Sequence, residues 1–277
     1  MTSLGPGAPP APFAPVLRID GDPGLGLVLV CDHARNALPQ AYGDLGLPPA
    51  AFERHIAYDI GAERVTRGLA RRLGVPTVMA GFSRLLIDPN RGEDDPTLIR
   101  QLYDGTVIAG NYPLSEDERE RRLERFYRPY HAAVAGLVAE VHARSGRAPL
   151  VVSIHSFTPQ LANRPPRPWH VGLLWDTDGR AALPLIEALR AEPGLVVGDN
   201  EPYDGALRGD TMFRHAILAG FPHALIEVRQ DLIGTEDGAD AWAARLAPLV
   251  DAVNRRPDIG RVQRFSSRTG PIEDGTP

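Results

Sequence analysis

The sequence contains no lysine, so all 30 of its strongly basic residues are arginine. This absence excludes chemistry that needs a lysine amine, such as a Schiff base with a carbonyl substrate. Cysteine is almost as scarce, since Cys31 is the only one. A single cysteine excludes an internal disulfide framework and a cysteine-rich zinc site. Because Cys31 lies inside an apolar run, we interpret it as a small core residue rather than a nucleophile.

Long apolar runs and an excess of positive charge are also missing. No stretch approaches the run of about 18 apolar residues that a membrane helix needs. The formal net charge of -5 argues against a general nucleic-acid-binding protein. The N-terminus lacks the basic and apolar regions of a signal peptide. We therefore expect a cytoplasmic protein with no membrane or nucleic-acid partner; the sequence does not specify its oligomeric state.

The chain alternates strand-like and helix-like patterns between two polar ends. Its 277 residues and 43% hydrophobic content suit one large domain, and no linker-like stretch divides it. We predict a flexible N-terminal arm over residues 1–15, one domain over 16–264 and a flexible tail over 265–277. The alternation predicts the α/β class, as a three-layer αβα sandwich around a mostly parallel mixed sheet.

Periodicity and turn residues place the individual elements. Strands are predicted at 26–31, 75–80, 85–87, 149–154, 170–175, 195–198 and 223–228. Helices are predicted at 50–73, 115–144, 179–191, 210–219 and 238–255. Residues 92–114 show little periodicity and are predicted to form a long loop of the kind that walls or covers an active site.

Three of the predicted strands run directly into polar residues. The apolar run before Asp32 and His33 is one, and the run before His155 is the second. The third leads into Glu227. Open α/β sheets keep their sites at the carboxyl ends of such strands, so we hypothesise that these three strand ends meet around a metal ion.

A hydrolytic zinc site needs about three protein ligands, an open position and a nearby carboxylate base. His33 and His155 are the two histidine candidates. Asn36, three residues after His33, or Asp59, in the predicted helix that follows, could complete the set. Asp59 is the better donor of the two because its carboxylate is charged.

Glu227 is the candidate general base, since a carboxylate in a buried strand needs a partner or a function. Arg229 lies two residues further along and shares its face of the strand. It could hold Glu227 or a substrate. His215 lies in the predicted helix before the third strand and is a further catalytic candidate.

A dense polar cluster is the candidate substrate-binding region. It contains Arg84, Asp88, Asn90 and Arg91. Arginine suits a substrate carboxylate because its planar fork binds both oxygens. A surface turn with internal Asp–Arg pairs is the alternative interpretation. Ser156, next to a candidate ligand, is included as a further substrate-binding residue.

Several of these motifs together resemble the N-formylglutamate amidohydrolase family. They span about residues 28 to 233 and are Cys-Asp-His-Ala-Arg-Asn at 31–36, Tyr-Asp-Ile-Gly at 58–61, Ser-Arg-Leu-Leu-Ile-Asp-Pro-Asn-Arg at 83–91, Ser-Ile-His-Ser at 153–156, Asn-Glu-Pro-Tyr at 200–203, Arg-His at 214–215 and Glu-Val-Arg-Gln-Asp at 227–231. The same pieces are more distantly similar to the zinc carboxypeptidases. Segment 33–36 resembles their His-x-x-Glu zinc motif, 88–91 their carboxylate-gripping Asn-Arg pair, 153–156 the strand end with the last zinc histidine, and 227–229 the strand with the catalytic glutamate. Asn36 departs from that pattern, which leaves the third ligand open.

The resemblance implies a zinc-carboxypeptidase-like fold, one zinc ion and an enzyme of amino-acid catabolism. Its substrate would be a small molecule, an N-formyl or other N-acyl amino acid such as N-formyl-L-glutamate. Hydrolysis of the amide would give the free amino acid and a small carboxylate. Two alternatives are a carboxypeptidase-like peptidase, and a non-catalytic small-molecule-binding protein whose metal site has decayed through Asn36.

Overall fold

A computed structural model describes residues 13–272 of the chain. Its centre is a seven-stranded sheet in the order β1-β3-β2-β6-β9-β7-β8. The strands are β1 (Val16–Ile19), β2 (Leu27–Cys31), β3 (Thr77–Ala80), β6 (Leu150–Phe157), β7 (Val171–Leu174), β8 (Val197–Asp199) and β9 (His223–Arg229). The four strands β3, β2, β6 and β9 are parallel to one another. Strand β1 pairs antiparallel with β3, and β7 pairs antiparallel with β9 but in parallel with β8. The predicted mostly parallel mixed sheet is confirmed.

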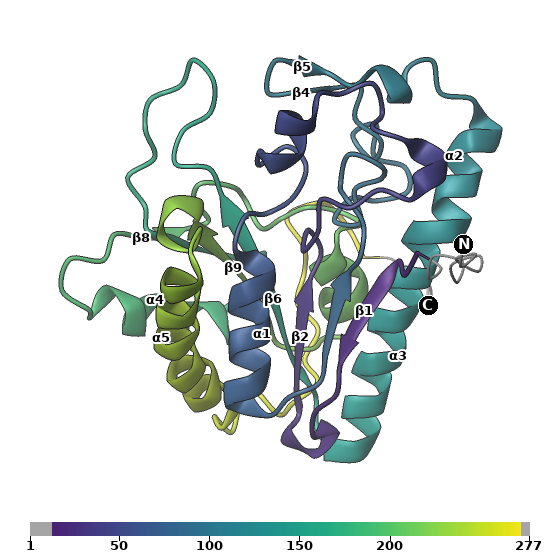
Figure 1. The fold of residues 1–277 in the computed structure, drawn as a ribbon. Helices are drawn as coiled ribbons and strands as arrows, with labels where there is room; N and C mark the ends of the chain where they lie inside the picture. Colours follow the sequence, from purple (N-terminus) through teal and green to yellow (C-terminus); the bar gives the residue numbers. More distant parts are fainter. Residues whose placement is uncertain (1–12, 273–277) are drawn as a thin grey trace, which may run out of the picture.

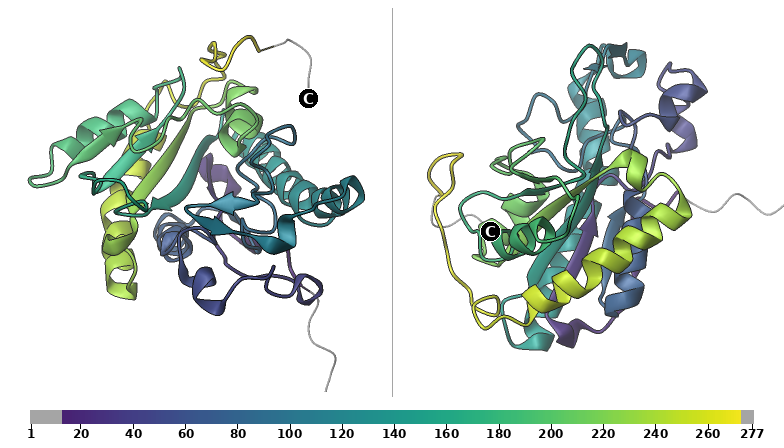
Figure 2. Two further views of the ribbon diagram at one scale, coloured as in Figure 1. Left: turned by 90° about the horizontal axis from the view of Figure 1, so that it is seen from above. Right: turned by 90° about the vertical axis from the view of Figure 1, so that its left-hand side faces the viewer.

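Helices cover both faces of this sheet (Figures 1 and 2). On one face lie α1 (Ala62–Leu73), α4 (Ala182–Arg190) and α5 (Glu236–Asn254). On the other lies α3 (Arg128–Ser145), which continues from α2 (Glu116–Arg122) through a π-helical turn at Leu123–Tyr127. This arrangement is the predicted three-layer α/β fold. In the part of the chain that is described, no helix is both long and apolar enough to cross a membrane.

Strand alternation divides the core into two layers. In β2, Leu29 and Cys31 pack in the cluster that contains α1 and α5, whereas Val28 and Val30 pack in the cluster that contains α3. Successive strand side chains point to opposite faces, and both faces of this sheet are covered by helices. The strand therefore reads as a continuous apolar run, and its buried Cys31 is a core residue, as predicted.

The predicted helix at 50–73 is wrong over its first half. A short 3-10 helix covers Pro49–Glu53, and α1 begins only at Ala62, after Gly61 with a φ of +83°. The intervening turn is held by tertiary bonds: the Asp59 N–H donates to the His33 carbonyl (2.9 Å) and the Ser83 hydroxyl to the Ala57 carbonyl (2.7 Å). Asp59 is therefore on a fixed turn and not on a helix.

Other boundaries also differ from prediction. Residues 85–87 are fully buried but form a turn, not a strand. The predicted loop at 92–114 contains a hairpin of β4 (Leu102–Tyr103) and β5 (Thr106–Val107), which stands above the sheet in Figure 1. The predicted helix at 210–219 is a short helical segment built around a π-helical turn at Phe213–Ile217. Strand β1 was not predicted, because four residues are too few for a clear pattern.

The ends of the chain are only partly described. Residues 1–12 of the predicted arm and 273–277 of the predicted tail lie outside the described residues. Within the description, Phe13 packs edge-on against Phe126, with ring centroids 6.0 Å apart. Arg268 forms ion pairs with Asp176 (3.2 Å) and Asp204 (2.6 Å). The division into arm, domain and tail stays a prediction.

Candidate functional site

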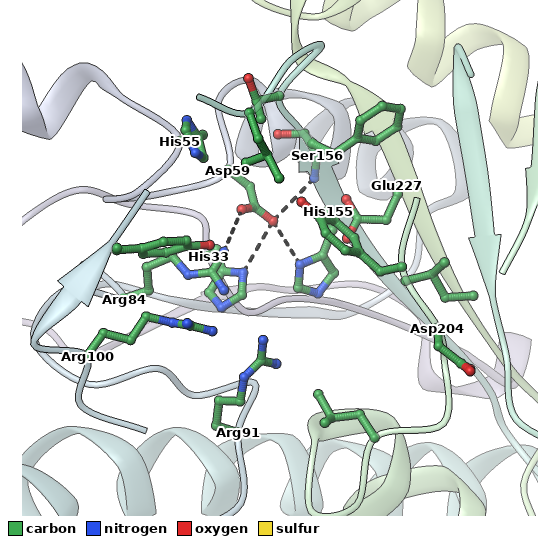
Figure 3. Close-up of a pocket in the computed structure, with 17 residues that line it drawn as sticks. His33, His55, Asp59, Arg84, Arg91, Arg100, His155, Ser156, Asp204 and Glu227 are labelled. Carbon is green, nitrogen blue, oxygen red and sulfur yellow. Dashed lines mark hydrogen bonds and ion pairs between the residues drawn. The ribbon is translucent and has the colours of Figure 1, made fainter. Parts of the chain in front are cut away.

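The three predicted strand ends lie side by side in the sheet. Strand β6 pairs in parallel with both β2 and β9, and His155 lies in register opposite Glu227. His33 follows two residues after the end of β2. All three side chains line a cavity of about 340 Å³, and each is at most 6% exposed (Figure 3). The strand-end arrangement predicted from sequence is what the structure shows.

Two histidines and one aspartate converge at the floor of this cavity. The Nδ1 atoms of His33 and His155 lie 3.3 and 2.8 Å from the same oxygen, Oδ2 of Asp59. One ligand atom from each of the three residues lies within 4.8 Å of the others. The backbone N–H of Ser156 donates to the same oxygen (3.2 Å), which fixes the carboxylate. Two imidazole nitrogens and a carboxylate oxygen are ligands that zinc accepts.

Each imidazole is backed by a second carboxylate. The Nε2 of His33 lies 2.6 Å from Asp88 Oδ1, and the Nε2 of His155 lies 2.9 Å from Asp32 Oδ2. Burial opposes ionisation of both aspartates, but Arg84 beside Asp88 and the hydrogen bond from His155 to Asp32 hold their pKa values well below the usual range. Ionised carboxylates only accept hydrogen bonds, so each Nε2 carries a hydrogen. The Nδ1 atoms are then the imidazole nitrogens available to a metal ion beside Asp59, which would take the place of any hydrogen on them.

Asp32 was named in the sequence but not chosen as a site residue. Its carboxylate is fully buried and accepts hydrogen bonds from Tyr130 (2.8 Å), Thr211 (2.5 Å) and Ser153 (3.0 Å), besides the one from His155. A charged side chain at the end of a wholly buried strand was the available signal. Its four donors, however, come from segments that sequence alone does not bring together.

Arg84 and Asp88 form hydrogen bonds with the residues of the candidate metal site. The Arg84 guanidinium donates to Asp88 Oδ2 (2.8 Å) and to Asp59 Oδ1 (3.3 Å). Asp88 is thereby shared between Arg84 and His33 and is wholly buried. These contacts suit positioning of the two carboxylates. The predicted substrate-binding role of this pair stays a prediction.

Two other predicted substrate residues, Arg91 and Ser156, line the same cavity, whereas Asn90 does not. The Arg91 guanidinium donates to the Asn90 carbonyl (2.8 Å) and to Thr97 Oγ1 (3.2 Å). The side-chain oxygen of Asn90 accepts from the Thr211 N–H (3.1 Å). The Ser156 hydroxyl donates to the Ile60 carbonyl (2.9 Å), which ties β6 to the turn that carries Asp59.

Besides Asp88 and Asn90, three further predicted residues are not among those that line the cavity. The Asn36 amide donates to the Phe52 carbonyl (2.8 Å) and is not among the lining residues, so the geometry favours Asp59 as the third ligand. Arg229 pairs with Asp231 (2.8 Å). His215 hydrogen-bonds to His131 (2.9 Å) and lines a separate cavity. These positions give no support to direct contact of Arg229 or His215 with a substrate.

Glu227 has the environment of an acid–base group. Its Oε2 is buried without a hydrogen-bond partner among the described residues. Burial raises the pKa of Glu227 to about 7; the positive charge of His155 opposes the shift and the negative charge of Asp59 adds to it. A carboxyl group in this state can take up and release a proton near neutral pH.

Part of the cavity wall, here called the outer wall, is formed by Arg100, Tyr103 and Leu161, which were not predicted individually from the sequence. Arg100 and Tyr103 lie on or before the β4–β5 hairpin, inside the segment predicted as an active-site wall. Leu161 also lines the cavity. Asp104 at the hairpin turn accepts a hydrogen bond from the Ala162 N–H (3.1 Å), which joins the two segments.

Together, the fold and the cavity define an α/β protein with a candidate metal centre at the carboxyl ends of parallel strands. The chain matches the family model of N-formylglutamate amidohydrolase over residues 25–234, and it belongs to that family. The family prediction made from the motifs is confirmed.

Individual relatives agree with this assignment. An N-formylglutamate deformylase of Pseudomonas aeruginosa is 31% identical over 205 residues, covering 67% of this chain and 74% of that protein. One of Pseudomonas putida is 31% identical over 160 residues, covering 53% of this chain and only 58% of that relative. The crystal structure of gene product Atu2144 from Agrobacterium tumefaciens is 34% identical with a TM-score of 0.79, covering 86% of this chain and 94% of that one.

Proposed function

We propose that the protein is a metal-dependent amidohydrolase that cleaves the amide of an N-acyl amino acid, with N-formyl-L-glutamate as the first substrate to test. The products are the free amino acid and a small carboxylate, as in amino-acid catabolism. Family membership and the names of the Pseudomonas relatives support this substrate class. The observation that supports it most directly is the Asp59 carboxylate between the imidazoles of His33 and His155, beside Glu227, whose Oε2 has no hydrogen-bond partner among residues 13–272. A cytoplasmic location stays part of the proposal.

The donor set fits one zinc ion. His33 and His155 would bind it through Nδ1 and Asp59 through its carboxylate, while Asp88 and Asp32 orient the two imidazoles. Three protein ligands with a position open to a cavity are typical of catalytic rather than structural zinc. Zinc bound at such a site supplies Lewis acidity toward a carbonyl oxygen.

The protein's own residues account for the proton transfers. Glu227 in its ionised form accepts a proton from the attacking water and, once protonated, donates it to the nitrogen of the leaving amine. A pKa near neutrality lets the same carboxyl group perform both transfers. Arg91, whose guanidinium lines the cavity, binds a substrate carboxylate and so orients the amide.

The size of the cavity favours an N-acyl amino acid over a peptide. Its volume of about 340 Å³ lies near the lower end of ordinary ligand pockets. The Asp104–Ala162 hydrogen bond joins two segments that contribute lining residues, Tyr103 and Leu161, and we expect it to restrict the mouth where a longer chain would leave. This argues against the peptidase alternative. The binding-protein alternative rested on Asn36, and its amide points at a backbone carbonyl instead of the three convergent ligands.

The test combines metal content with turnover on one sample. Elemental analysis should find about one zinc per chain, and release of formate from N-formyl-L-glutamate should stop when a chelator is added and resume with zinc. His33→Ala should lose the metal, whereas His142→Ala, an exposed histidine on α3, should keep it. A chain that neither holds zinc nor turns over after zinc is added would support the binding-protein alternative. Activity on peptides alone would support the peptidase.

A further inference from the structure

Arg100 places a guanidinium in the cavity wall without an anionic partner among the described residues. Its Nε is buried and has no hydrogen-bond partner within residues 13–272. The guanidinium carbon lies 4.5 Å from the centre of the Tyr103 ring, and the side chain lines the same cavity as His33 and Glu227 (Figure 3). No ion pair with a described carboxylate compensates its charge.

The other two cavity arginines are better compensated. Arg84 is held by Asp88 (2.8 Å) and Asp59 (3.3 Å). Arg91 donates to a carbonyl and a hydroxyl and has Asp95 at 3.9 Å. Burial lowers the pKa of Arg100, and the positive charges of Arg84 and Arg91 act in the same direction. A half-buried, unpaired cation is unfavourable, and an anion from the ligand would relieve it.

The position of Arg100 indicates which anion it would meet. Arg91 follows Asn90, whose N–H donates to Asp88, the partner of His33, so Arg91 is anchored to the floor of the site. Arg100 instead belongs to the outer wall with Tyr103 of the hairpin. In an N-acyl derivative of glutamate, the α-carboxylate is close to the amide and the side-chain carboxylate is further away. We therefore assign Arg91 to the carboxylate near the amide and Arg100 to the more distant one.

We infer that Arg100 binds the side-chain carboxylate of a dicarboxylic N-acyl amino acid and sets the preference for acidic over neutral side chains. This inference rests on the proposed function and adds to it a residue that determines specificity. The Tyr103 ring beneath the guanidinium holds the fork in place, so less side-chain freedom is lost on binding.

A purely structural role predicts different behaviour. The Arg100 backbone carbonyl accepts from the Asn111 amide (2.7 Å), and this bond survives any side-chain substitution. If the side chain served only to pack on Tyr103, its removal would change thermal stability without distinguishing one substrate from another.

The test compares two substrates that differ only in side-chain charge, N-formyl-L-glutamate and N-formyl-L-glutamine. The wild type should prefer the glutamate derivative. Arg100→Gln should lower kcat/KM for the glutamate derivative by about 30-fold or more, the loss typical of an unpaired buried charge partner, and change the glutamine derivative little. Arg100→Lys keeps the charge but not the fork, and should restore part of the preference.

Arg125→Gln is the matched control, because Arg125 also lies over an aromatic ring, that of Phe126, but on the exposed surface of the helix leading into α3. It should leave both substrates unaffected. Equal losses on both substrates for a folded Arg100→Gln, or no loss on either, would overturn the inference while leaving the proposed function standing.

A binding measurement tests the role of Arg100 without depending on catalysis. Isothermal titration calorimetry of L-glutamate and L-glutamine should show tighter binding of glutamate to the wild type, with the difference removed in Arg100→Gln. If the wild type turns over no N-formyl amino acid, the proposed function fails, but this titration still decides the role of Arg100. Equal affinities of the wild type for the two amino acids would refute it.

Discussion

Asp32→Asn is the substitution that most directly tests how the candidate metal centre is organised. The carboxylate accepts from Tyr130 and Thr211 on Oδ1, and from Ser153 and His155 on Oδ2. Asparagine has nearly the same shape but replaces one oxygen by an NH₂ group. In one orientation the NH₂ group donates to the Tyr130 and Thr211 hydroxyls, and His155 keeps an acceptor that no longer carries a negative charge. In the other, the amide oxygen keeps the two Oδ1 partners and the NH₂ group faces the two donors on the other side.

The consequences for those two donors differ. The Ser153 hydroxyl can rotate and accept a hydrogen bond, but His155 Nε2 can accept only after giving up its hydrogen. The imidazole then carries its hydrogen on Nδ1, the atom that points at Asp59. A nitrogen that bears a hydrogen has no lone pair for a metal. Loss of such a supporting carboxylate typically weakens metal binding about 10- to 100-fold, which corresponds to about 1.4–2.8 kcal/mol.

Zinc affinity should therefore be measured by competition with a chromophoric chelator at fixed pH, and the tautomer of His155 by ¹⁵N NMR. Asp20→Asn, at an exposed aspartate before β2, is the control for loss of one negative charge. A folded Asp32→Asn protein whose zinc affinity stays within about threefold of wild type would refute the reasoning, since even the weaker end of the expected range is about tenfold.

Three further predictions concern other parts of the molecule. Glu227→Gln should lower kcat by about 100-fold or more, because an amide cannot carry the proton, while zinc content stays unchanged; full activity in a chelator-sensitive enzyme would contradict this. Burial lowers the pKa of His131 to about 3 and of His215 to about 4, whereas an unfolded histidine titrates near about 6.5. The unfolded chain then binds more protons, so the free energy of unfolding should fall as the pH drops from about 6.5 toward 4, and urea titrations of His215→Gln should show a shallower fall. Asp104→Ala frees the Ala162 N–H and opens the mouth, so the ratio of kcat/KM for an N-acyl dipeptide to that for N-formyl-L-glutamate should rise severalfold; an unchanged ratio would show that the mouth does not limit substrate length.

The parts of the site that lie directly after strands could be predicted from sequence. An apolar run that ends in His33, His155 or Glu227 predicts a strand with a polar residue at its carboxyl end. The carboxyl ends of parallel strands lie at the same edge of the sheet, so these residues could be predicted to lie near one another. The same reasoning did not identify Asp32 as a site residue. Its neighbours in the sequence do not show whether the carboxylate accepts four hydrogen bonds or only ends a strand. Its partners are set by tertiary structure alone.

The parts of the site on turns were harder to predict. Ile56 and Ile60 have helical spacing, and this spacing suggested a helix through Asp59. Ile56 is instead buried under the segment that follows β2, in a small cluster with Leu45 and Leu85. Burial on an irregular turn and burial on a helix leave the same apolar pattern, so periodicity could not separate them.

Arg100 was missed for a related reason. An arginine in a loop without periodicity has no local signal that it lacks a partner, since that depends on every carboxylate nearby in space. Asn36 shows the converse: a position in a recognisable motif suggested a ligand, but the side chain is satisfied by a backbone carbonyl.

The four hydrogen bonds of Asp32 also affect how the protein reaches its folded state. Its partners Tyr130 and Thr211 lie 98 and 179 positions away along the chain. Contacts of such long range form slowly, because large loops must close before they contribute any stability. A chain still emerging from the ribosome has no Thr211 until most of it has been made. The arrangement of residues at the candidate metal centre therefore forms only in a nearly complete molecule, and truncated or partly folded chains will lack it.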